Sequence, residues 1–320
     1  MSRDVRTFTN VDWEPEFGKE TWAFMPYTRK DFIRLEGSTI PIIGKLFYRA
    51  PGGHLLKVGG DEGEARMTVL ARYVLEGIVK VAEVHAFIQL PKNQSAVLME
   101  YLCGIPLSSV WSDLSATQRI TVKNQLCDIL LAMRKPSFKY AGRPGRRPYV
   151  LLSELNLSTY DFCSNEKEWN GSRKQAIVDN VADMHRADFL CKQQGELVKT
   201  DRFVLTHGDL ADRGIIVDTD TLNIVGLIDW ENAIVAPTYF EYVAARLSGG
   251  HEPYWQSELL EVLGKVLEKE CEETKANVEE EMARWKALVD VERYAQGLDD
   301  NCAWTFEPND SPQAAIAGPK

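Results

Sequence analysis

Two aspartates mark residues 202–233, which read RFVLTHGDLADRGIIVDTDTLNIVGLIDWENA. Asp209 precedes one apolar run and Asp229 follows another, and the turn between the runs is rich in Asp and Thr. This pattern predicts a β-hairpin, which would bring the two carboxylates together at its open end. Converging carboxylates are costly unless a cation or a proton lies between them. Phosphoryl transfer uses such a pair, since one carboxylate accepts a hydrogen bond from the attacking hydroxyl and the other holds magnesium.

The elements that would position this pair begin with a strand-rich unit. Short apolar runs over residues 38–60 predict strands broken by a Pro-Gly-Gly turn at residues 51–53. Residues 62–77 carry apolar side chains at helical spacing, with a glycine as the stop signal. Residues 81–90 and 95–102 are two further strand-like runs joined by Pro-Lys-Asn-Gln. We therefore expect a small sheet with one helix.

After residue 103 the pattern becomes mainly helical. Residues 115–134 predict an amphipathic helix with Ile120, Leu126, Ile129, Leu130 and Met133 on one side. A second helix is predicted over residues 172–194, and two more over 254–273 and 277–297. The chain is thus predicted to be α+β and two-lobed, with an irregular or helical N-terminal extension over 1–37, an N-lobe over 38–103, a C-lobe over 104–310 and a disordered tail over 311–320.

The pair of motifs resembles a known family. H-G-D-L at residues 207–210 and I-D-W-E at 228–231 are similar to the H-G-D-L-x-x-x-N and I-D-W/F-E motifs of the aminoglycoside phosphotransferase and choline kinase branch of the protein-kinase-like fold. The chain looks especially like the small fungal phosphotransferase-like proteins of that branch. The resemblance spans roughly residues 40–306. It implies a small antiparallel-sheet N-lobe on the nucleotide side and a larger, mainly helical C-lobe on the catalytic and acceptor side.

The resemblance also assigns roles on the C-lobe side. Asp209 matches the catalytic aspartate, and Asp229 matches the aspartate that holds magnesium. His207 matches the motif histidine that keeps the catalytic loop in shape. ATP and magnesium are the cofactors that these motifs imply.

The nucleotide side is assigned in the same way. Lys57, at the end of a predicted strand, matches the lysine that binds the ATP phosphates, and Glu64 matches its ion-pair partner. Glu100, Tyr101 and Leu102 match the hinge whose backbone contacts adenine. Taken alone, Lys57 reads as a solvated lysine at a strand end, and only the downstream motif reverses that interpretation. Glu64 also reads as a first-turn glutamate favoured by the helix dipole, and Asp229 as the end of a strand. A phosphate-covering loop at Gly44 is offered only by position, because no G-x-G-x-x-G occurs.

Gly214 departs from the family pattern. It occupies the position of the motif asparagine, which holds a magnesium ion in the family. Magnesium keeps water ligands readily, so Asp229 and the ATP phosphates would hold one ion more easily than two. Asp212, Asp218 or Glu231 is a candidate to compensate.

Three functions stay open at this point. The first is an ATP-dependent phosphotransferase acting on a small-molecule hydroxyl, impaired by Gly214. The second is a kinase-like fold recruited to a non-phosphoryl reaction in secondary metabolism, and the third is a pseudokinase that binds a nucleotide or a small molecule without catalysis. Fold alone does not choose among these, because function belongs to the site.

Composition narrows the class of partner. The 320 residues carry a formal charge of −10 with a pI near 5.2, which disfavours nucleic-acid binding. The six cysteines form no C-x-x-C pair, so free thiols in a reducing compartment are expected. The N-terminal residues lack an apolar signal segment, and no run reaches the roughly 18 apolar residues of a membrane span. The sequence predicts a cytoplasmic protein that binds a small-molecule acceptor and neither membrane nor nucleic acid; it leaves the oligomeric state open.

Two charged stretches are candidates for acceptor contacts. For the glutamates of residues 268–281, the family resemblance implies an acidic pocket for an amine-bearing acceptor, whereas the charge pattern itself favours a solvated helix face. The loop at 142–148, Gly-Arg-Pro-Gly-Arg-Arg-Pro, would meet an anionic acceptor or lie exposed.

Overall fold

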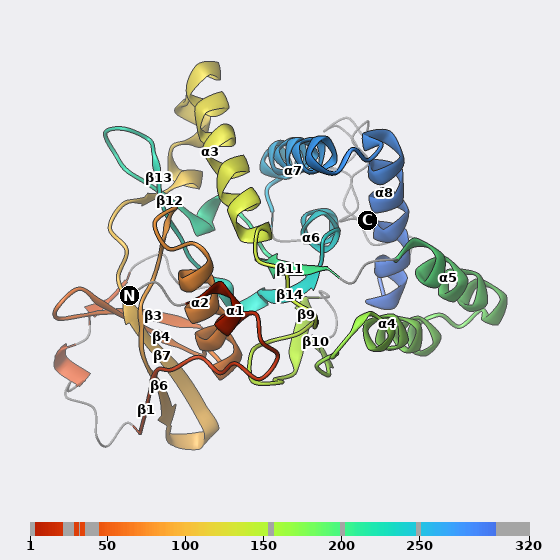
Figure 1. Cartoon of the computed structure of the whole chain (residues 1–320). Helices are drawn as coiled ribbons and strands as arrows, with labels where there is room; N and C mark the ends of the chain where they lie inside the picture. The colour runs from red at the N-terminus through yellow and green to blue at the C-terminus, as the bar shows by residue number, and fades with distance from the viewer. Residues whose placement is uncertain are drawn as a thin grey trace, which may run out of the picture.

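The computed structural model describes residues 4–21, 29–31, 33–35, 45–152, 157–198, 202–247 and 251–298. Gly44, Cys302 and the predicted tail at 311–320 lie outside the described residues. The described part has an antiparallel-rich sheet near its N-terminus and helices through most of its C-terminal part (Figure 1). The predicted α+β class is therefore confirmed.

The N-terminal sheet has six strands in the order β1-β6-β7-β4-β3-β2. Their bounds are β1 Gly18–Thr21, β2 Ile33–Arg34, β3 Leu46–Ala50, β4 His54–Val58, β6 Val84–Leu90 and β7 Gln94–Glu100. β3 and β4 form a hairpin through Gly52 and Gly53, whose φ angles of 77° and 80° suit glycine. β4 then pairs with β7, with Lys57 opposite Val97. The predicted turn is confirmed, and so are the four predicted strands, which correspond to β3, β4, β6 and β7.

Helix α2, Glu62–Val74, packs against this sheet beside the short α1, Val5–Phe8 (Figure 1). Asp61 caps its N-terminus by accepting a hydrogen bond from the backbone N–H of Glu64 at 2.6 Å. Such a cap satisfies one of the N–H groups that a helix start leaves without a partner. The helix ends three residues before Gly77, which has a φ of 77°.

The expected irregular or helical extension over residues 1–37 needs correction in its described part. β1 adds to the edge of the sheet by pairing in parallel with β6, and β2 adds to the opposite edge by pairing with β3. The sequence pattern missed both strands because their side chains are mostly exposed and do not alternate between apolar and polar.

The C-terminal part is built from long helices around small sheets. The helices are α3 Ala116–Arg134, α4 Glu166–Asn180, α5 Met184–Leu197, α6 Phe240–Leu247, α7 Pro253–Thr274 and α8 Val278–Ala295. α6 lies in the middle and packs against both α7 and α8 (Figure 1). The remaining elements are β9 Tyr149–Leu152, β10 Leu157–Tyr160, β11 Phe203–Thr206, β14 Ile234–Pro237 and short 3₁₀ turns, of which η6 Asp212–Gly214 and η7 Trp230–Asn232 bear on the site.

Two helix predictions were wrong in detail. The single helix expected over residues 172–194 is two helices, because Asp183 starts α5 as its N-cap, accepting hydrogen bonds from two backbone N–H groups. Ile120, placed on the buried face of α3, is 52% exposed, whereas Leu126, Ile129, Leu130 and Met133 are buried. Ile120 lies in the first turns of α3, before the helix reaches the core.

The predicted hairpin is present. β12, Ile215–Val217, pairs with β13, Ile224–Leu227, and Ile215 lies opposite Leu227. β13 also pairs with β5, Lys80–Val81, and β12 pairs with β8, Ile105–Pro106. Because β5 and β8 flank the two central strands β6 and β7 in the sequence, this four-stranded sheet fixes the hairpin against the N-terminal unit.

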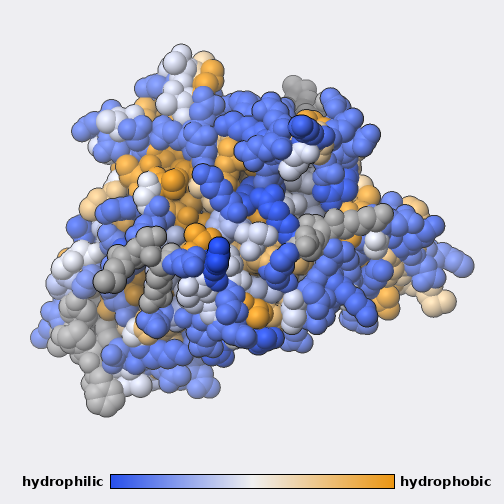
Figure 2. Space-filling model, in the orientation of Figure 1, coloured by the Kyte–Doolittle hydropathy of each residue, from blue (hydrophilic) through white to orange (hydrophobic). Residues whose placement is uncertain are grey.

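The surface agrees with the composition. The face in Figure 2 is mostly hydrophilic, with an apolar area beside α3. Within the described residues, no helix is both long and apolar enough to pass through a lipid bilayer.

Candidate functional site

Lys57 lies at the centre of a buried cluster of charges. Its Nζ is 2.7 Å from Glu64 Oε1, 2.6 Å from Asp229 Oδ1 and 2.7 Å from Glu231 Oε2. The side chain is only 2% exposed. The structure thus brings together three of the residues expected at the nucleotide and metal sites, and it adds Glu231, which the sequence offered only as a compensating group.

The charges in this cluster shift one another's pKa values. Burial lowers the pKa of Lys57, but the nearby carboxylates of Glu64, Asp229 and Glu231 outweigh burial and raise it well above its ordinary value. Burial raises the pKa of Glu64, and the charges of Asp229 and Glu231 raise it further against the opposing effect of Lys57. The pKa of Asp229 is lowered, because the charge and hydrogen bond of Lys57 overcome its burial. At neutral pH Lys57 is therefore cationic and Asp229 anionic.

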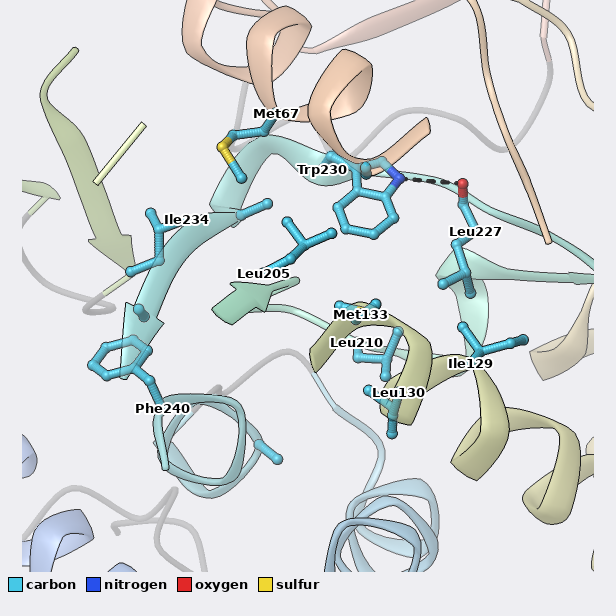
Figure 3. Close-up of a cluster of buried hydrophobic side chains, with 14 of the residues drawn as sticks. Met67, Ile129, Leu130, Met133, Leu205, Leu210, Leu227, Trp230, Ile234 and Phe240 are labelled. Atoms are coloured by element: carbon cyan, nitrogen blue, oxygen red, sulfur yellow. Dashed lines mark hydrogen bonds between the residues drawn. The ribbon is translucent and has the colours of Figure 1, made fainter. Parts of the chain in front are cut away.

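Asp229 adopts a backbone conformation that is unusual for a residue with a side chain. Its φ of 69° and ψ of 57° place it in the left-handed region, which costs of order 1–3 kcal/mol outside glycine. The next residue, Trp230, anchors the turn: it is buried, and its Nε1–H donates to Leu227 O at 3.3 Å. Figure 3 shows its indole pointing into the cluster that contains Leu205 and Met133. Core packing therefore stabilises the strained residue that presents the carboxylate.

The Glu241 side chain of α6 holds the H-G-D-L loop in place through hydrogen bonds to its backbone. Its carboxylate accepts hydrogen bonds from the backbone N–H groups of His207 at 2.6 Å and Gly208 at 3.2 Å. The His207 ring is fully buried; its Nδ1 accepts from Asp209 N, so its Nε2 carries the proton and donates to Ile228 O at 3.0 Å. His207 thereby ties the loop of Asp209 to the residue before Asp229.

Asp209 is tightly oriented by two basic side chains. Its Oδ1 is 3.0 Å from His251 Nε2, and its Oδ2 accepts a hydrogen bond from Arg213 at 3.0 Å. Burial opposes ionisation, but the hydrogen bond from His251 and the charge of Arg213 outweigh it and lower the pKa of Asp209 to about 2. The negative charge of Asp209 also acts on Asp229, where it partly offsets the lowering of the Asp229 pKa by Lys57.

Sequence reasoning missed His251 and Arg213 as site residues. Arg213 lies four residues after Asp209, in a variable position of the motif, and carries no signal of its own. His251 comes from the segment just before α7, and only the tertiary fold brings its buried ring to Asp209.

Gly214 lies beside the end of the strand that leads to Asp229, and it has no side chain. Its carbonyl accepts from Ile228 N at 3.0 Å, one residue before Asp229. A Cβ added to Gly214 would lie 3.3 Å from Ile228 O, and its φ is not in the left-handed region. A side chain at this position would therefore project beside the backbone of Ile228, the residue before Asp229, with only a small adjustment.

The three candidates for compensation differ in position. Asp212 is buried and accepts a hydrogen bond from Tyr254 at 2.8 Å. Asp218 is used within its own turn, where it accepts from Asp220 N and from Thr221. Glu231 alone among the three joins the Asp229 cluster, and Lys45 also binds its carboxylate.

The three carboxylates around Lys57 are suitable ligands for a hard divalent cation. Within the described ranges, Glu64, Asp229 and Glu231 each offer a carboxylate oxygen, and these oxygens lie within 4.8 Å of one another. Among the residues that the structure describes, none donates a hydrogen bond to the buried Glu64 Oε2, which is costly for a carboxylate oxygen. Oxygen ligands of this kind are those that magnesium prefers. Because all three carboxylates already bind the Lys57 ammonium, the donor set fits one such ion beside Lys57 Nζ, sharing these oxygens with it.

The expected hinge follows β7. Tyr101 N donates to Gly53 O at 2.7 Å, so this N–H is used to bind the β3–β4 turn. The Glu100 side chain points to surface charges, lying 3.4 Å from Arg72 and 3.3 Å from Lys80. Leu102 packs against the backbone of Gly226 in the hairpin, since a Cβ there would lie 2.8 Å from Leu102 Cδ1. Tyr101 and Leu102 together therefore connect the β3–β4 turn to the β12–β13 hairpin.

The arginine loop at 142–148 is not simply exposed, as one expectation had it. Arg143 is buried and donates to the backbone carbonyls of Glu231 and Ala233 and to the carboxylate of Asp61. All of these partners are groups of the chain itself. Arg143 therefore connects the start of α2 to the turn that follows Asp229.

Comparison with known proteins adds independent findings. A model of the phosphotransferase enzyme family matches residues 62–268, well over half of the chain. Among curated protein sequences, no significant match is found.

Solved structures resemble this fold over most of its length. Aminoglycoside phosphotransferase APH(4)-Ia superposes with a TM-score of 0.55 at 13% identity, covering 84% of this chain and 86% of that chain. A thermostable mutant of that enzyme, in a ternary complex with AMP-PNP and hygromycin B, gives a TM-score of 0.54 at 14% identity over the same shares of the two chains. At such low identity the likeness shows the fold alone, and it confirms the predicted two-lobed, protein-kinase-like architecture.

Proposed function

Because this chain belongs to the phosphotransferase enzyme family, we propose that it transfers the terminal phosphate of ATP to a hydroxyl of a small molecule. One observation carries the proposal: Lys57 binds Glu64 and Asp229 at once, and the His207 ring hydrogen-bonds both Asp209 N and Ile228 O, which places the Asp209 loop beside the residue before Asp229. A cation for phosphate, a carboxylate for metal and a carboxylate for the acceptor are the parts that phosphoryl transfer uses. Use of ATP is supported by AMP-PNP in the complex of the structural neighbour.

Each residue then has a physical role. Lys57, kept cationic by its carboxylate partners, binds the phosphates of the nucleotide. Asp229 and Glu231 would hold a magnesium ion, with the orphaned oxygen of Glu64 beside them. When bound, such an ion neutralises negative charge on the phosphate oxygens.

Asp209 acts on the acceptor. With a pKa of about 2 it is ionised at neutral pH and is a weak base, so its main effect is to accept a hydrogen bond from the acceptor hydroxyl and orient the oxygen. His251 and Arg213 fix both of its carboxylate oxygens, which limits the directions in which that hydroxyl can approach. Positioning of this kind supplies much of the rate enhancement in phosphoryl transfer.

Gly214 is the specific observation behind a second candidate, a protein that binds nucleotide without transferring phosphate. Gly214→Asn tests both functions, with Gly214→Ala as the matched control that adds a Cβ without the amide. If the enzyme is impaired by the missing ligand, we expect Gly214→Asn to raise acceptor-dependent ADP production roughly 10-fold or more above Gly214→Ala.

Binding must be measured alongside turnover. MgATP binding, followed as a shift of the melting temperature, is expected for the native chain and all three variants: Gly214→Ala, Gly214→Asn and Asp209→Asn. Only Asp209→Asn should eliminate ADP production while keeping the shift. A melting shift with no ADP production in the native chain or in Gly214→Asn would establish the binding protein and exclude the transferase.

Membership of the small fungal subgroup and a cytoplasmic location stay predictions.

A further inference from the structure

A second lysine lies beside the Lys57 cluster. Lys45 directly precedes β3, and its ammonium group donates to Glu231 Oε2, the same oxygen that lies 2.7 Å from Lys57 Nζ. Two lysines of the N-terminal unit therefore share one carboxylate oxygen. Because Glu231 belongs to the proposed metal ligands, Lys45 lies at the same site and not on a separate surface.

The pairing of β3 with β4 directs both lysines to one face of the sheet. Phe47 lies opposite Lys57 in the register, so these two side chains point to the same face. Side chains alternate between the two faces along a strand. Lys45 comes two residues before Phe47 and therefore continues on its face. The hairpin register thus brings the Lys45 ammonium to the cluster.

The two ammonium groups differ in the number of donors they have left. An ammonium group has three N–H donors. Lys57 donates to the carboxylates of Glu64, Asp229 and Glu231, so each of its donors is used. Among the residues that the structure describes, Lys45 donates to Glu231 only. Lys57 can therefore bind a phosphate oxygen only by releasing a carboxylate, whereas Lys45 has donors to spare.

Exposure separates the two lysines in the same direction. The side chain of Lys57 is 2% exposed, and that of Lys45 is 22% exposed. Asp229, the carboxylate on the open side of the cluster, is 34% exposed. A ligand that arrives from solvent therefore reaches Lys45 more easily than Lys57.

Arg143, another cation beside Glu231, is not suited to bind a ligand. Its guanidinium is buried, and it donates to the backbone carbonyls of Glu231 and Ala233 and to the Asp61 carboxylate. The carboxylates around Lys57 repel a polyphosphate, so nucleotide binding at this site needs an accessible cation. Lys45 meets that need.

We propose that Lys45 is a second phosphate-binding residue, which donates to a phosphate oxygen of the bound nucleotide through a donor that Glu231 does not occupy. It adds to Lys57 a positive charge that offsets the carboxylates of the cluster. The inference rests on the proposed phosphotransfer and names a further nucleotide-binding residue for it.

An alternative role for Lys45 is only to neutralise the charge of Glu231. The two roles differ in their consequence when Glu231 becomes a glutamine. A lysine that only neutralises Glu231 then has no further effect on nucleotide binding. A lysine that binds phosphate still contributes, and contributes more strongly because no carboxylate competes for its ammonium group.

Nucleotide binding to the full chain tests this difference. AMP-PNP and adenosine are titrated by calorimetry, first with EDTA so that no metal takes part and then with Mg²⁺. Lys45→Gln should weaken AMP-PNP binding about 10-fold or more in both conditions, as expected for one hydrogen bond between charged groups. Adenosine, which has no phosphate, should bind as it does to the native chain. Lys45→Arg keeps the charge and should retain most of the AMP-PNP binding.

Two further variants locate the effect. Lys269→Gln is the matched control, because it removes the same charge from an exposed ion pair with Asp128, and it should change the binding of neither ligand. In a Glu231→Gln background with EDTA, Lys45→Gln should weaken AMP-PNP binding by at least the same factor as in the native chain. Melting temperatures confirm that each variant is folded.

The outcomes are distinct. Unchanged AMP-PNP binding in Lys45→Gln, an equal loss of adenosine binding, or a loss that disappears in the Glu231→Gln background would overturn the role of Lys45. The expected binding pattern without Asp209-dependent ADP production would support Lys45 as a phosphate-binding residue and refute phosphotransfer. Asp209-dependent ADP production with a native KM for ATP in Lys45→Gln would support phosphotransfer and overturn the role of Lys45. A native chain that binds no AMP-PNP would overturn both.

Discussion

The Arg143 guanidinium provides a demanding test of how the site is held together. Its Nε lies 3.3 Å from Ala233 O, another nitrogen donates to Glu231 O, and the third lies 3.4 Å from the Asp61 carboxylate. Asp61 is also the N-cap of α2, which carries Glu64. Arg143 therefore connects the two segments that supply the partners of Lys57.

Gly63 is the perturbation that exposes this connection. A Cβ at Gly63 would lie 2.0 Å from a guanidinium nitrogen of Arg143 and 2.9 Å from its Cζ. In a solvent-exposed helix Gly→Ala stabilises by about 0.5–1 kcal/mol. Here the new methyl must displace the guanidinium, and Glu231 O and Ala233 O then lose their donor at about 1–3 kcal/mol each. We therefore expect Gly63→Ala to destabilise the protein by about 2–4 kcal/mol, opposite in sign to helix propensity.

A double-mutant cycle measured by urea unfolding tests the cause. Arg143→Ala should cost a similar amount, and in its background Gly63→Ala should become neutral or stabilising, giving a coupling energy of about 3 kcal/mol. Arg146→Ala is the control, because its pair with Asp12 is exposed on both sides and should contribute less than about 1 kcal/mol. Additive effects of the two changes, or a stabilising Gly63→Ala in the native background, would refute the reasoning.

Three further predictions concern the charges themselves. The pKa of Asp209 is lowered to about 2, so its stabilising contribution is complete above its unfolded pKa near 4 and is lost as the pH falls towards 2; urea midpoints between pH 6 and 2 should fall less steeply for Asp209→Asn. Lys57→Met should destabilise by about 3–5 kcal/mol because it leaves a buried carboxylate unpaired, and adding Glu64→Gln should restore part of the stability but no MgATP-dependent melting shift; full stability of Lys57→Met alone would contradict the pairing. Glu231→Gln should weaken Mn²⁺ binding, measured by water-proton relaxation, at least 10-fold, whereas Asp218→Asn should not, and equal effects of the two would remove Glu231 from the proposed metal site.

Local patterns predicted much of the fold. The β12–β13 hairpin was predictable because two apolar runs around a polar turn specify it within a few residues. Lys57 and Glu64 are close in sequence, at the end of one strand and the start of the next helix, so their pairing follows from two adjacent elements. The polar edge strands β1 and β2 have no such signal, because little of either is buried.

The long-range contacts that hold the site residues in place could not be predicted in the same way. His251 reaches Asp209 across 42 residues, and Arg143 reaches Glu231 across 88. Neither contact follows from periodicity, because it depends on how separate elements pack. The left-handed backbone of Asp229 is equally hidden, since an aspartate before a tryptophan does not indicate a positive φ. Sequence therefore indicated which charged groups come together, and tertiary packing determines how they are oriented.

Gly214 and Glu231 together raise the question whether the Glu231 carboxylate replaces the missing asparagine as a metal ligand. A side chain at 214 would project beside the residue before Asp229, and the Glu231 carboxylate already lies in the Asp229 cluster. If both positions can serve the same ion, their effects cannot be additive, because a ligand that is already present leaves less for a second one to contribute. The gain in phosphotransfer from Gly214→Asn should then be larger in a Glu231→Gln background than in the native chain. An equal gain in both backgrounds would mean that Glu231 serves Lys57 and Lys45 alone, and that the missing asparagine has no substitute.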